Sequence, residues 1–396
     1  MRKLSLSVIG MYLGILSAFS QTDSSQYKSR KLQTDEINFV SGYYHQNGNN
    51  SAVTGGIGTE KLTDFANTIE LKLSRYDRHY RKHSFTLGLG VDHYSSASSD
   101  KIDPNTISSA SSADTRFYPS LAWSIRNEKN RTTLGLNTSF SNEFDYRSFG
   151  IGASFTKTSK DNNREFTGKA QAYFDQWSVI LPIELRTNTG NREHDDYPSS
   201  PRNSFSAALD LSQVVNRNLQ VMLITEPTYQ SGLLATKYQR IYFKNGSLST
   251  ETLPDTRFKL PVGLRANYFA GDKLIIRSFY RYYQDNWGIK AHTVDLELPL
   301  KITPFFSISP FYRYYTQTAA KYFAPYGQHD PSETYFTSDY DLSAFHSQYF
   351  GSGFRMAPPE GVFKIKHFNS LEIRYGHYLR SNGLTSDQLS LQLKFK

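Results

Sequence analysis

Cysteine is absent from this sequence of 396 residues. Without a thiol, the chain has no disulfide, no thiolate metal ligand and no cysteine nucleophile, and it suits an exported protein that stays unfolded in an oxidising compartment. Long apolar runs are missing too. Beyond the first twenty residues, no stretch reaches the roughly 18 consecutive apolar residues that a membrane-spanning helix needs. Thiol chemistry and helical membrane spans are therefore excluded.

A strong excess of one charge sign is also missing. The chain has 45 Lys and Arg against 36 Asp and Glu, a net charge of +9, but the excess is spread along the sequence. Because no basic cluster interleaved with aromatic residues stands on an otherwise soluble domain, binding of nucleic acid is not expected. Aromatic residues are abundant instead: 15% of the chain, with 28 Tyr and 27 Phe. Such an excess is typical of the aromatic girdles of a membrane β-barrel.

Residues 387–396 show the pattern that organises the whole chain. Leu389, Leu391, Leu393 and Phe395 alternate with polar residues such as Gln392. A period of two predicts a strand with one apolar and one polar face. A barrel removes the open edge of such a strand by pairing the last strand with the first, and an apolar outer face is the normal unit of an outer-membrane barrel.

The same alternation recurs throughout the sequence. Together with turn residues, it predicts sixteen strands, at about 36–45, 65–75, 82–94, 114–126, 130–141, 145–157, 165–177, 202–213, 218–229, 257–269, 272–285, 288–301, 303–317, 346–358, 365–378 and 386–396. Most are long enough to cross a bilayer at a tilt, unlike the shorter strands of a sandwich. Residues 176–186 leave fourteen or eighteen strands as alternatives.

Connector lengths give a second indication. The long connectors, 46–64, 95–113, 178–201, 230–256 and 318–345, all follow odd-numbered strands, whereas connectors after even-numbered strands are short. Outer-membrane barrels have short periplasmic turns and longer external loops. The sequence therefore predicts an all-β, up-and-down antiparallel transmembrane barrel.

The N-terminal region has the features of an export signal. Residues 1–20 combine Arg2 and Lys3 with a short apolar stretch and a small-residue cleavage site. Residues 21–35 are polar and are expected to be disordered. We therefore expect a signal peptide at 1–20, a disordered segment at 21–35 and a barrel at 36–396, located in the outer membrane of a Gram-negative bacterium.

Two segments resemble a known family. Residues 41–64 (SGYYHQNGNNSAVTGGIGTEKLTD) and 90–123 (GVDHYSSASSDKIDPNTISSASSADTRFYPSLAW) are similar to signature segments of a domain-of-unknown-function family of outer-membrane β-barrel proteins from Bacteroidota. The resemblance implies signal-directed export and a barrel in the outer membrane. It implies no established biochemical activity.

The candidate site is a charged wall on the inner face of four neighbouring strands. Alternation places seven charged residues there: Lys259, Arg265, Arg277, Arg281, Asp295, Glu297 and Arg313. Charge lining a pore selects ions and solutes, so the excess of cations would attract anionic solutes. The alternative is mutual pairing between adjacent strands, which would stiffen and neutralise the wall.

Two loops carry further candidates. The Gly-rich segment Thr54, Gly55, Gly56, Ile57, Gly58, Thr59, Glu60 and Lys61 either folds into the lumen and narrows it or forms an ordinary external loop. The Ser-rich loop 95–114 carries Asp100, Asp103 and Asp114, whose oxygens could hold Ca²⁺. A solvated turn-forming loop is the preferred interpretation, so no metal is expected.

The leading functional hypothesis is a passive pore or solute-binding channel in contact with outer-membrane lipid, with no cofactor and no enzymatic activity. A surface scaffold that binds a partner through the loops 230–256 and 318–345 is the alternative. A barrel hydrolase is a minor third. It would use residues such as His194 or His329, which are expected to be solvated histidines instead. The solute, the partner and the oligomeric state do not follow from the sequence.

Overall fold

The computed structural model describes residues 30–95, 113–186 and 198–396. The regular structure of this part is almost entirely strand. Its strands are β1 (Gln33–Asn47), β2 (Leu62–Tyr76), β3 (Lys82–Tyr94), β4 (Asp114–Asn127), β5 (Thr132–Asn142), β6 (Tyr146–Thr158), β7 (Arg164–Ser178), β8 (Ser199–Val214), β9 (Leu219–Thr225), β10 (Thr228–Gly232), β11 (Arg240–Tyr242), β12 (Leu248–Thr250), β13 (Thr256–Ala270), β14 (Leu274–Asp285), β15 (Lys290–Glu297), β16 (Leu300–Thr303), β17 (Phe306–Gln317), β18 (Phe345–Met356), β19 (Phe368–Arg380) and β20 (Thr385–Phe395). The 3₁₀ segments are η1 (Ala52–Thr54), η2 (Ile183–Leu185), η4 (Tyr340–Leu342) and η5 (Val362–Lys364).

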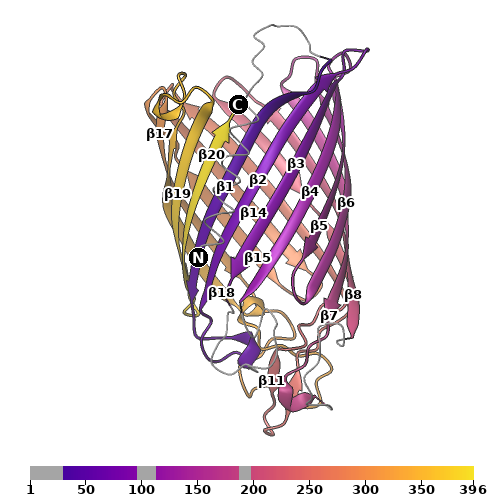
Figure 1. Cartoon of the computed structure of the whole chain (residues 1–396). Helices are drawn as coiled ribbons and strands as arrows, with labels where there is room; N and C mark the ends of the chain where they lie inside the picture. The colour runs from indigo at the N-terminus through magenta and orange to yellow at the C-terminus, as the bar shows by residue number, and fades with distance from the viewer. Residues whose placement is uncertain (1–29, 96–112, 187–197) are drawn as a thin grey trace.

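The sheet closes into a cylinder of tilted strands (Figure 1). Around the cylinder all pairings are antiparallel and follow the order of the chain, and β20 returns to pair with β1 from Ile37↔Phe395 to Asn47↔Thr385. Closure leaves no unpaired edge, which is what a sheet within a bilayer requires.

Proline divides two of the barrel strands. Pro227 separates β9 from β10, and Pro299 separates β15 from β16. Because proline has no backbone N–H, it interrupts the ladder at these points. The main sheet has eighteen segments, and counting each divided strand once gives the sixteen predicted barrel strands. An extra strand at 176–186 is ruled out, because β7 ends at Ser178 and η2 follows.

The outer face of the barrel is apolar. Leu87, Leu136, Leu264 and Val294 are between 44% and 54% exposed, and all lie on the face predicted to contact lipid. In water such a belt would drive aggregation, whereas in a bilayer it matches the hydrocarbon core. The fold is therefore that of a transmembrane β-barrel. Among the described residues, no helix is both long and apolar enough to cross a membrane.

The long connectors gather at one end, near β11, and the short ones at the other, where β20 ends (Figure 1). We refer to these as the external and the short-turn ends. The connector 357–367, which contains η5, is an exception in length at the short-turn end. At the N-terminal side, β1 begins at Gln33, three residues before the predicted strand, so residues 33–35 are not disordered: Asp35 accepts a hydrogen bond from Ser74.

Candidate functional site

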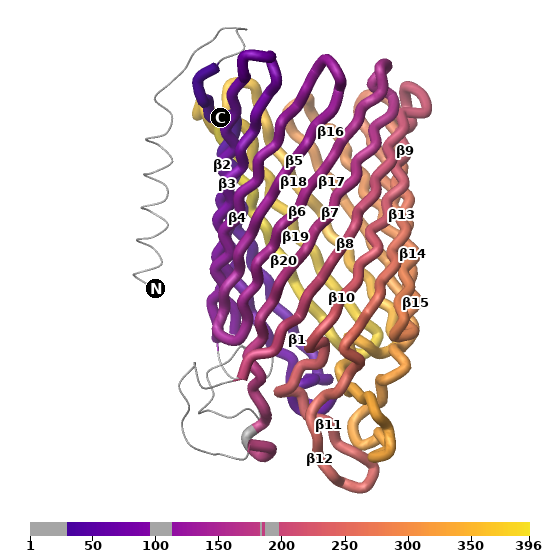
Figure 2. Tube along the Cα trace, turned by 90° about the vertical axis from the view of Figure 1, so that its right-hand side faces the viewer, coloured from indigo at the N-terminus to yellow at the C-terminus, as the bar shows by residue number. Residues whose placement is uncertain are grey.

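Three external loops fold together over one end of the barrel. They are residues 48–61, 233–255 and 318–344, and we call this unit the cap. The second and third loops are joined by a bridge between Thr252 and Phe336 and by another between Phe243 and His329. Figure 2 shows the hairpin β11–β12 projecting at this end. Backbone pairing between loops distant in sequence makes the cap a folded unit.

The cap has its own apolar core. Ile241, Phe243 and Phe336 are each at most 9% exposed and pack together, with the Phe243 and Phe336 rings in an edge contact at 5.0 Å. A second cluster joins Leu253 of the cap to Trp287, which lies in the turn between β14 and β15. The cap is therefore fastened to the rim of the barrel by hydrophobic contact.

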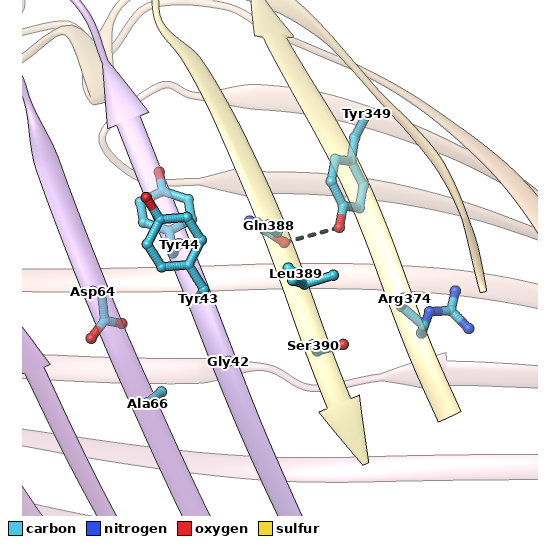
Figure 3. A pocket seen from close by; sticks show the side chains of 10 residues that line it. All are labelled: Gly42, Tyr43, Tyr44, Asp64, Ala66, Tyr349, Arg374, Gln388, Leu389 and Ser390. Carbon is cyan, nitrogen blue, oxygen red and sulfur yellow. Dashed lines mark hydrogen bonds between the residues drawn. The ribbon is translucent and has the colours of Figure 1, made fainter. Parts of the chain in front are cut away.

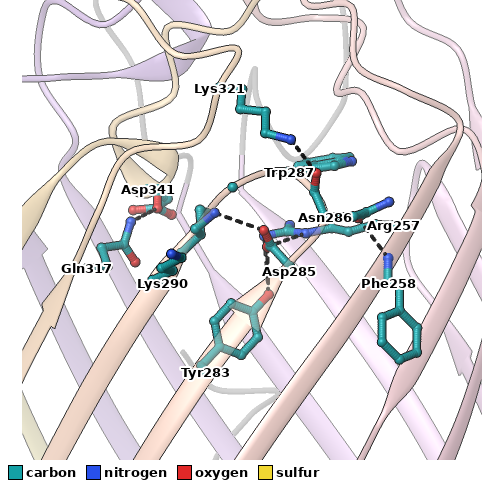
Figure 4. A network of polar contacts seen from close by, with 12 residues as sticks. Arg257, Phe258, Tyr283, Asp285, Asn286, Trp287, Lys290, Gln317, Lys321 and Asp341 are labelled. Atoms are coloured by element: carbon teal, nitrogen blue, oxygen red, sulfur yellow. Dashed lines mark hydrogen bonds and ion pairs between the residues drawn. The ribbon is translucent and has the colours of Figure 1, made fainter.

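A polar network strengthens the same attachment (Figure 4). The carboxylate of Asp285 accepts hydrogen bonds from the Arg257 guanidinium at 2.5 Å and from the Tyr283 hydroxyl at 2.8 Å. Arg257 lies over the Trp287 ring, 4.3 Å from its centroid. Lys321 of the cap donates to the carbonyl of Asn286 at 3.2 Å. These contacts hold the β14–β15 turn against the third loop.

The interior of the cap contains a buried carboxyl group. Glu251 is 2% exposed and accepts hydrogen bonds from the Thr236 N–H at 2.6 Å and from the Thr337 hydroxyl at 2.5 Å. Burial raises the pKa of Glu251 to about 7, because the charged form loses its hydration. Burial, together with the nearby carboxylates of Asp341 and Glu251, also raises the pKa of Asp339.

The Gly-rich loop packs against the second loop of the cap. Arg240 of β11 forms an ion pair with Glu184 at 2.5 Å and donates to the carbonyl of Val53 at 3.1 Å. Gly55 has a φ of +81°, and a Cβ there would lie 2.8 Å from the Tyr242 ring, so only glycine permits this close approach. The loop is thus held in place by the second and third loops.

The buried part of this loop borders two cavities at the external end. Val53 lines a cavity of about 490 Å³ with Arg116 and Arg202, which belong to β4 and β8. It also lines a cavity of about 430 Å³ with Tyr44 and Arg380, from β1 and β19. Val53 therefore lies beside two cavities that are lined by different parts of the wall. Of the predicted segment 54–61, Thr54 to Gly56 are buried, and burial raises the pKa of Glu60.

Within the lumen, part of the predicted charged wall forms ion pairs. Arg277 contacts Glu297 at 3.0 Å and Arg313 contacts Asp295 at 2.6 Å, each between directly paired positions of adjacent strands. Arg374 of β19 reaches Glu297 at 2.9 Å, although β17 and β18 lie between their strands. Such a contact is possible only across the concave inner face, so these side chains point into the lumen.

Three predicted wall cations have no carboxylate partner in the described part of the chain: Lys259, Arg265 and Arg281. Arg265 lies over the Phe279 ring at 5.6 Å, and Arg281 faces Gly263 and Thr293 on its two neighbouring strands. The two arginines are exposed although they lie on the inner face, so the lumen beside β13 and β14 is accessible to water.

A further cavity of about 340 Å³ lies at the seam where the barrel closes (Figure 3). Tyr44, Asp64, Arg374 and Gln388 line it from β1, β2, β19 and β20. The Tyr349 hydroxyl donates to Gln388 at 2.9 Å across one edge. One oxygen of Asp64 is buried and has no hydrogen-bond partner among the described residues, so the cavity has a polar edge at β2.

The described residues bring together neither the calcium-binding candidates nor the hydrolase candidates. Asp100, Asp103 and His194 lie outside the described residues, and Asp114 accepts hydrogen bonds from backbone N–H groups, including that of Phe144 at 3.1 Å. Within the described ranges, no cluster of three potential metal-binding side chains occurs.

The expectation that His329 is solvated was wrong, because this histidine is 1% exposed. Its Nδ1 is 2.8 Å from Glu333 and its Nε2 is 2.9 Å from the carbonyl of Thr337. Both ring nitrogens are therefore occupied, and neither can activate a nucleophile. The cap residues that sequence reasoning missed, such as Glu251 and Arg240, show no periodic signal. The one sequence feature that could have indicated their burial is an isolated charge within an aromatic-rich loop.

Fold and site together define a sixteen-stranded transmembrane β-barrel with a charged, water-accessible lumen and a folded external cap. The chain belongs to a family described as a protein of unknown function, DUF3570, whose model matches residues 13–357. No curated protein matches the sequence.

Solved structures show similar barrels at low identity. A mutant of the ferric enterobactin receptor PfeA from Pseudomonas aeruginosa is 9% identical, with a TM-score of 0.46 over 87% of this chain and 54% of that one, so the chain spans about half of that receptor. A BenF-like porin from Pseudomonas fluorescens Pf-5 is 8% identical, with a TM-score of 0.44 over 93% and 100%. OccD3 (OpdP) of Pseudomonas aeruginosa is 7% identical, with a TM-score of 0.44 over 94% and 93%.

Proposed function

We propose that the protein is a passive outer-membrane channel for a small solute, with a preference for anions along one side of its lumen. The observation that carries the proposal is the row formed by Lys259, Arg281 and Arg265 on β13 and β14. Because β13 is fully paired with β14, these cations follow one another down the lumen over about 20 Å, at roughly 3.3 Å per residue.

The remaining lumen charges support this preference. Most carboxylates on the inner face are paired with cations, as Asp92 is with Arg116 at 2.6 Å and Glu36 with Lys72 at 3.0 Å. Paired charges leave little field in the water nearby, whereas unpaired guanidinium groups in a low-dielectric wall attract anions. The cap, in which the Gly-rich loop is held by Arg240 and Tyr242, would then limit the size of what enters.

The test is conductance in a planar bilayer with a tenfold KCl gradient. The wild-type reversal potential should indicate anion preference, and Arg281→Gln should shift it toward cations. Arg217→Gln is the matched control, because Arg217 is exposed in the turn 215–218 at the short-turn end and carries the same charge outside the lumen. Absence of any conductance from correctly folded protein, or equal shifts in both variants, would contradict the proposal.

A surface scaffold is a second candidate, supported by the exposed aromatic residues of the cap. Tyr326 and Tyr335 of the third loop are 41% and 38% exposed. Exposed tyrosines on a rigid support are frequent anchors of protein interfaces. If the cap binds a partner, Tyr326→Ser together with Tyr335→Ser should abolish capture of that partner and leave the conductance unchanged.

A further inference from the structure

The connector 357–367, between β18 and β19 at the short-turn end, holds two residues in a strained conformation. Phe363 and Lys364 have φ angles of +53° and +64°, in the left-handed region that residues other than glycine rarely adopt. Val362 anchors the connector and is 0% exposed, yet the adjacent Phe363 is 71% exposed. The connector thus holds a strained backbone conformation in which the large apolar side chain of Phe363 is exposed.

This side chain lies on the outer face of the barrel. The Phe363 ring is 6.5 Å from that of Phe368, which in turn stacks on Phe395 at 4.8 Å and 20°. Phe395 ends the outward row of β20 that includes Leu389, which is 47% exposed. Phe363 therefore extends the lipid-facing surface by one further ring beyond the end of the last strand.

Cations flank the exposed apolar residues. Lys364 and Lys366 are exposed on either side of Ile365, which is itself 52% exposed. Neither ammonium group forms an ion pair within the described ranges. Glu360, also exposed, is the acidic residue of the same connector. Apolar side chains beside lysines are suited to the boundary of a membrane, where the rings enter the acyl region and the ammonium groups reach the headgroups.

We propose that residues 363–366 form a binding site for the phosphate headgroup of an anionic phospholipid in the leaflet at the short-turn end. Lys364 and Lys366 contact the phosphate, while Phe363 and Ile365 enter the acyl boundary. Two observations point to lipid: the site is continuous with the lipid-facing row of β20, and its unpaired charges complement an anionic headgroup. The site does not depend on the channel function, because it lies outside the lumen.

The location is tested by labelling, which the absence of cysteine makes specific. Phe363→Cys carries an environment-sensitive fluorophore in reconstituted protein, and Lys129→Cys, in the exposed turn between β4 and β5, is the control. Lipids with a quencher in the upper acyl chain should quench the label at position 363 and not that at position 129. Quenching at position 363 by an aqueous quencher alone would overturn the proposal.

The chemistry is tested by native mass spectrometry in detergent with phosphatidylglycerol. Each lysine near an anionic lipid surface contributes about a fivefold factor, so Lys364→Gln with Lys366→Gln should weaken binding of the first lipid by about 20- to 30-fold. The control is Lys129→Gln with Lys160→Gln, which removes two exposed turn lysines at the same end and should leave the affinity unchanged. Lys364→Arg with Lys366→Arg should retain binding.

The same spectra distinguish the other occupants. Equal lipid binding by the two double variants would overturn the proposal. Displacement of the lipid by inorganic phosphate at the same phosphate concentration would show a site for free anions instead. Dimers that form through Phe363, and that Phe363→Ser abolishes, would identify a second copy of the chain as the occupant and would also contradict it.

Discussion

A rise in pH should loosen the cap, because burial of Glu251 in the cap favours its protonated form. Its pKa in the fold is about 7, whereas an unperturbed glutamate titrates near 4.5. A folded pKa above the unfolded one means that the contribution of Glu251 is fully present below about 4.5 and is lost as the pH rises through about 7. The difference corresponds to roughly 3 kcal/mol in the opening free energy of the cap between pH 4 and pH 8.

Hydrogen–deuterium exchange of the loops measures this opening free energy directly. Amides in 233–255 and 318–344 should lose protection between pH 5 and pH 8, after correction for intrinsic exchange, by up to about a hundredfold. Amides in the short-turn halves of β3 and β14, such as those of Ser84 and Ile276, lie away from the cap and should show no comparable loss. Asp339, whose pKa is raised in the same direction, adds to the effect.

The control is Glu251→Gln, which keeps a side-chain oxygen for the Thr236 N–H but cannot ionise. The amides of this variant should remain protected from exchange at pH 8. Their protection should fall with pH only by the smaller amount that ionisation of Asp339 causes. If the variant keeps the full pH dependence of the wild type, or if the wild type shows none, the buried carboxyl of Glu251 does not control the cap.

The remaining predictions concern the wall and the cap core. Replacing Leu87 or Leu391 by Arg should destabilise the bilayer-embedded barrel by about 2–4 kcal/mol near the midplane, as measured by urea unfolding in vesicles; Thr86→Arg, on the lumen face, should be tolerated. Phe336→Ala should cost about 3 kcal/mol in the cap alone. It should raise both the protease sensitivity of 318–344 and the conductance, while the melting temperature of the barrel stays unchanged. A matching fall in barrel stability would show that cap and wall unfold together.

Most of the barrel was predictable because its strands obey one periodic rule. In a closed wall, successive side chains of a strand face lipid and lumen in turn. The alternation of apolar and polar residues in segments such as 134–140 and 294–300 therefore indicates which side chains face which environment. The interruptions at Pro227 and Pro299 were present in the sequence. Alternation continues across them, so each divided strand was predicted as a single strand.

The pairing of the wall charges was predictable only where it follows the register. Arg277 lies directly opposite Glu297, so adjacent strands suffice to suggest their ion pair. The contact between Glu297 and Arg374 crosses two intervening strands and depends on the curvature of the barrel. Arg281 has no ion-pair partner among the described residues because Thr293 and Gly263 face it, and this too follows only from the register.

The cap was not predictable, because its contacts join loops that share no repeating pattern. Glu251 meets Thr337 across 86 residues, and Arg240 meets Val53 across 187. Hydropathy assigns each of these loops to solvent, so burial of Glu251 or His329 has no local signal. Gly55 is a partial exception, since a Gly-rich run indicates unusual backbone angles but does not indicate which ring will pack against them.

Cap and wall should therefore respond differently to pH: the cap should change how easily a solute enters, and the wall should keep its preference for anions. The guanidinium groups of Arg265 and Arg281 remain charged at any physiological pH, so the part of the anion preference that these two residues supply should be constant. Glu251 ionises within the same range, so access through the cap should increase as the pH rises. A conductance that grows between pH 5 and pH 8 at an unchanged reversal potential would support this division. A reversal potential that moves with pH would place titrating carboxylates, rather than the arginines, in control of the conducting path.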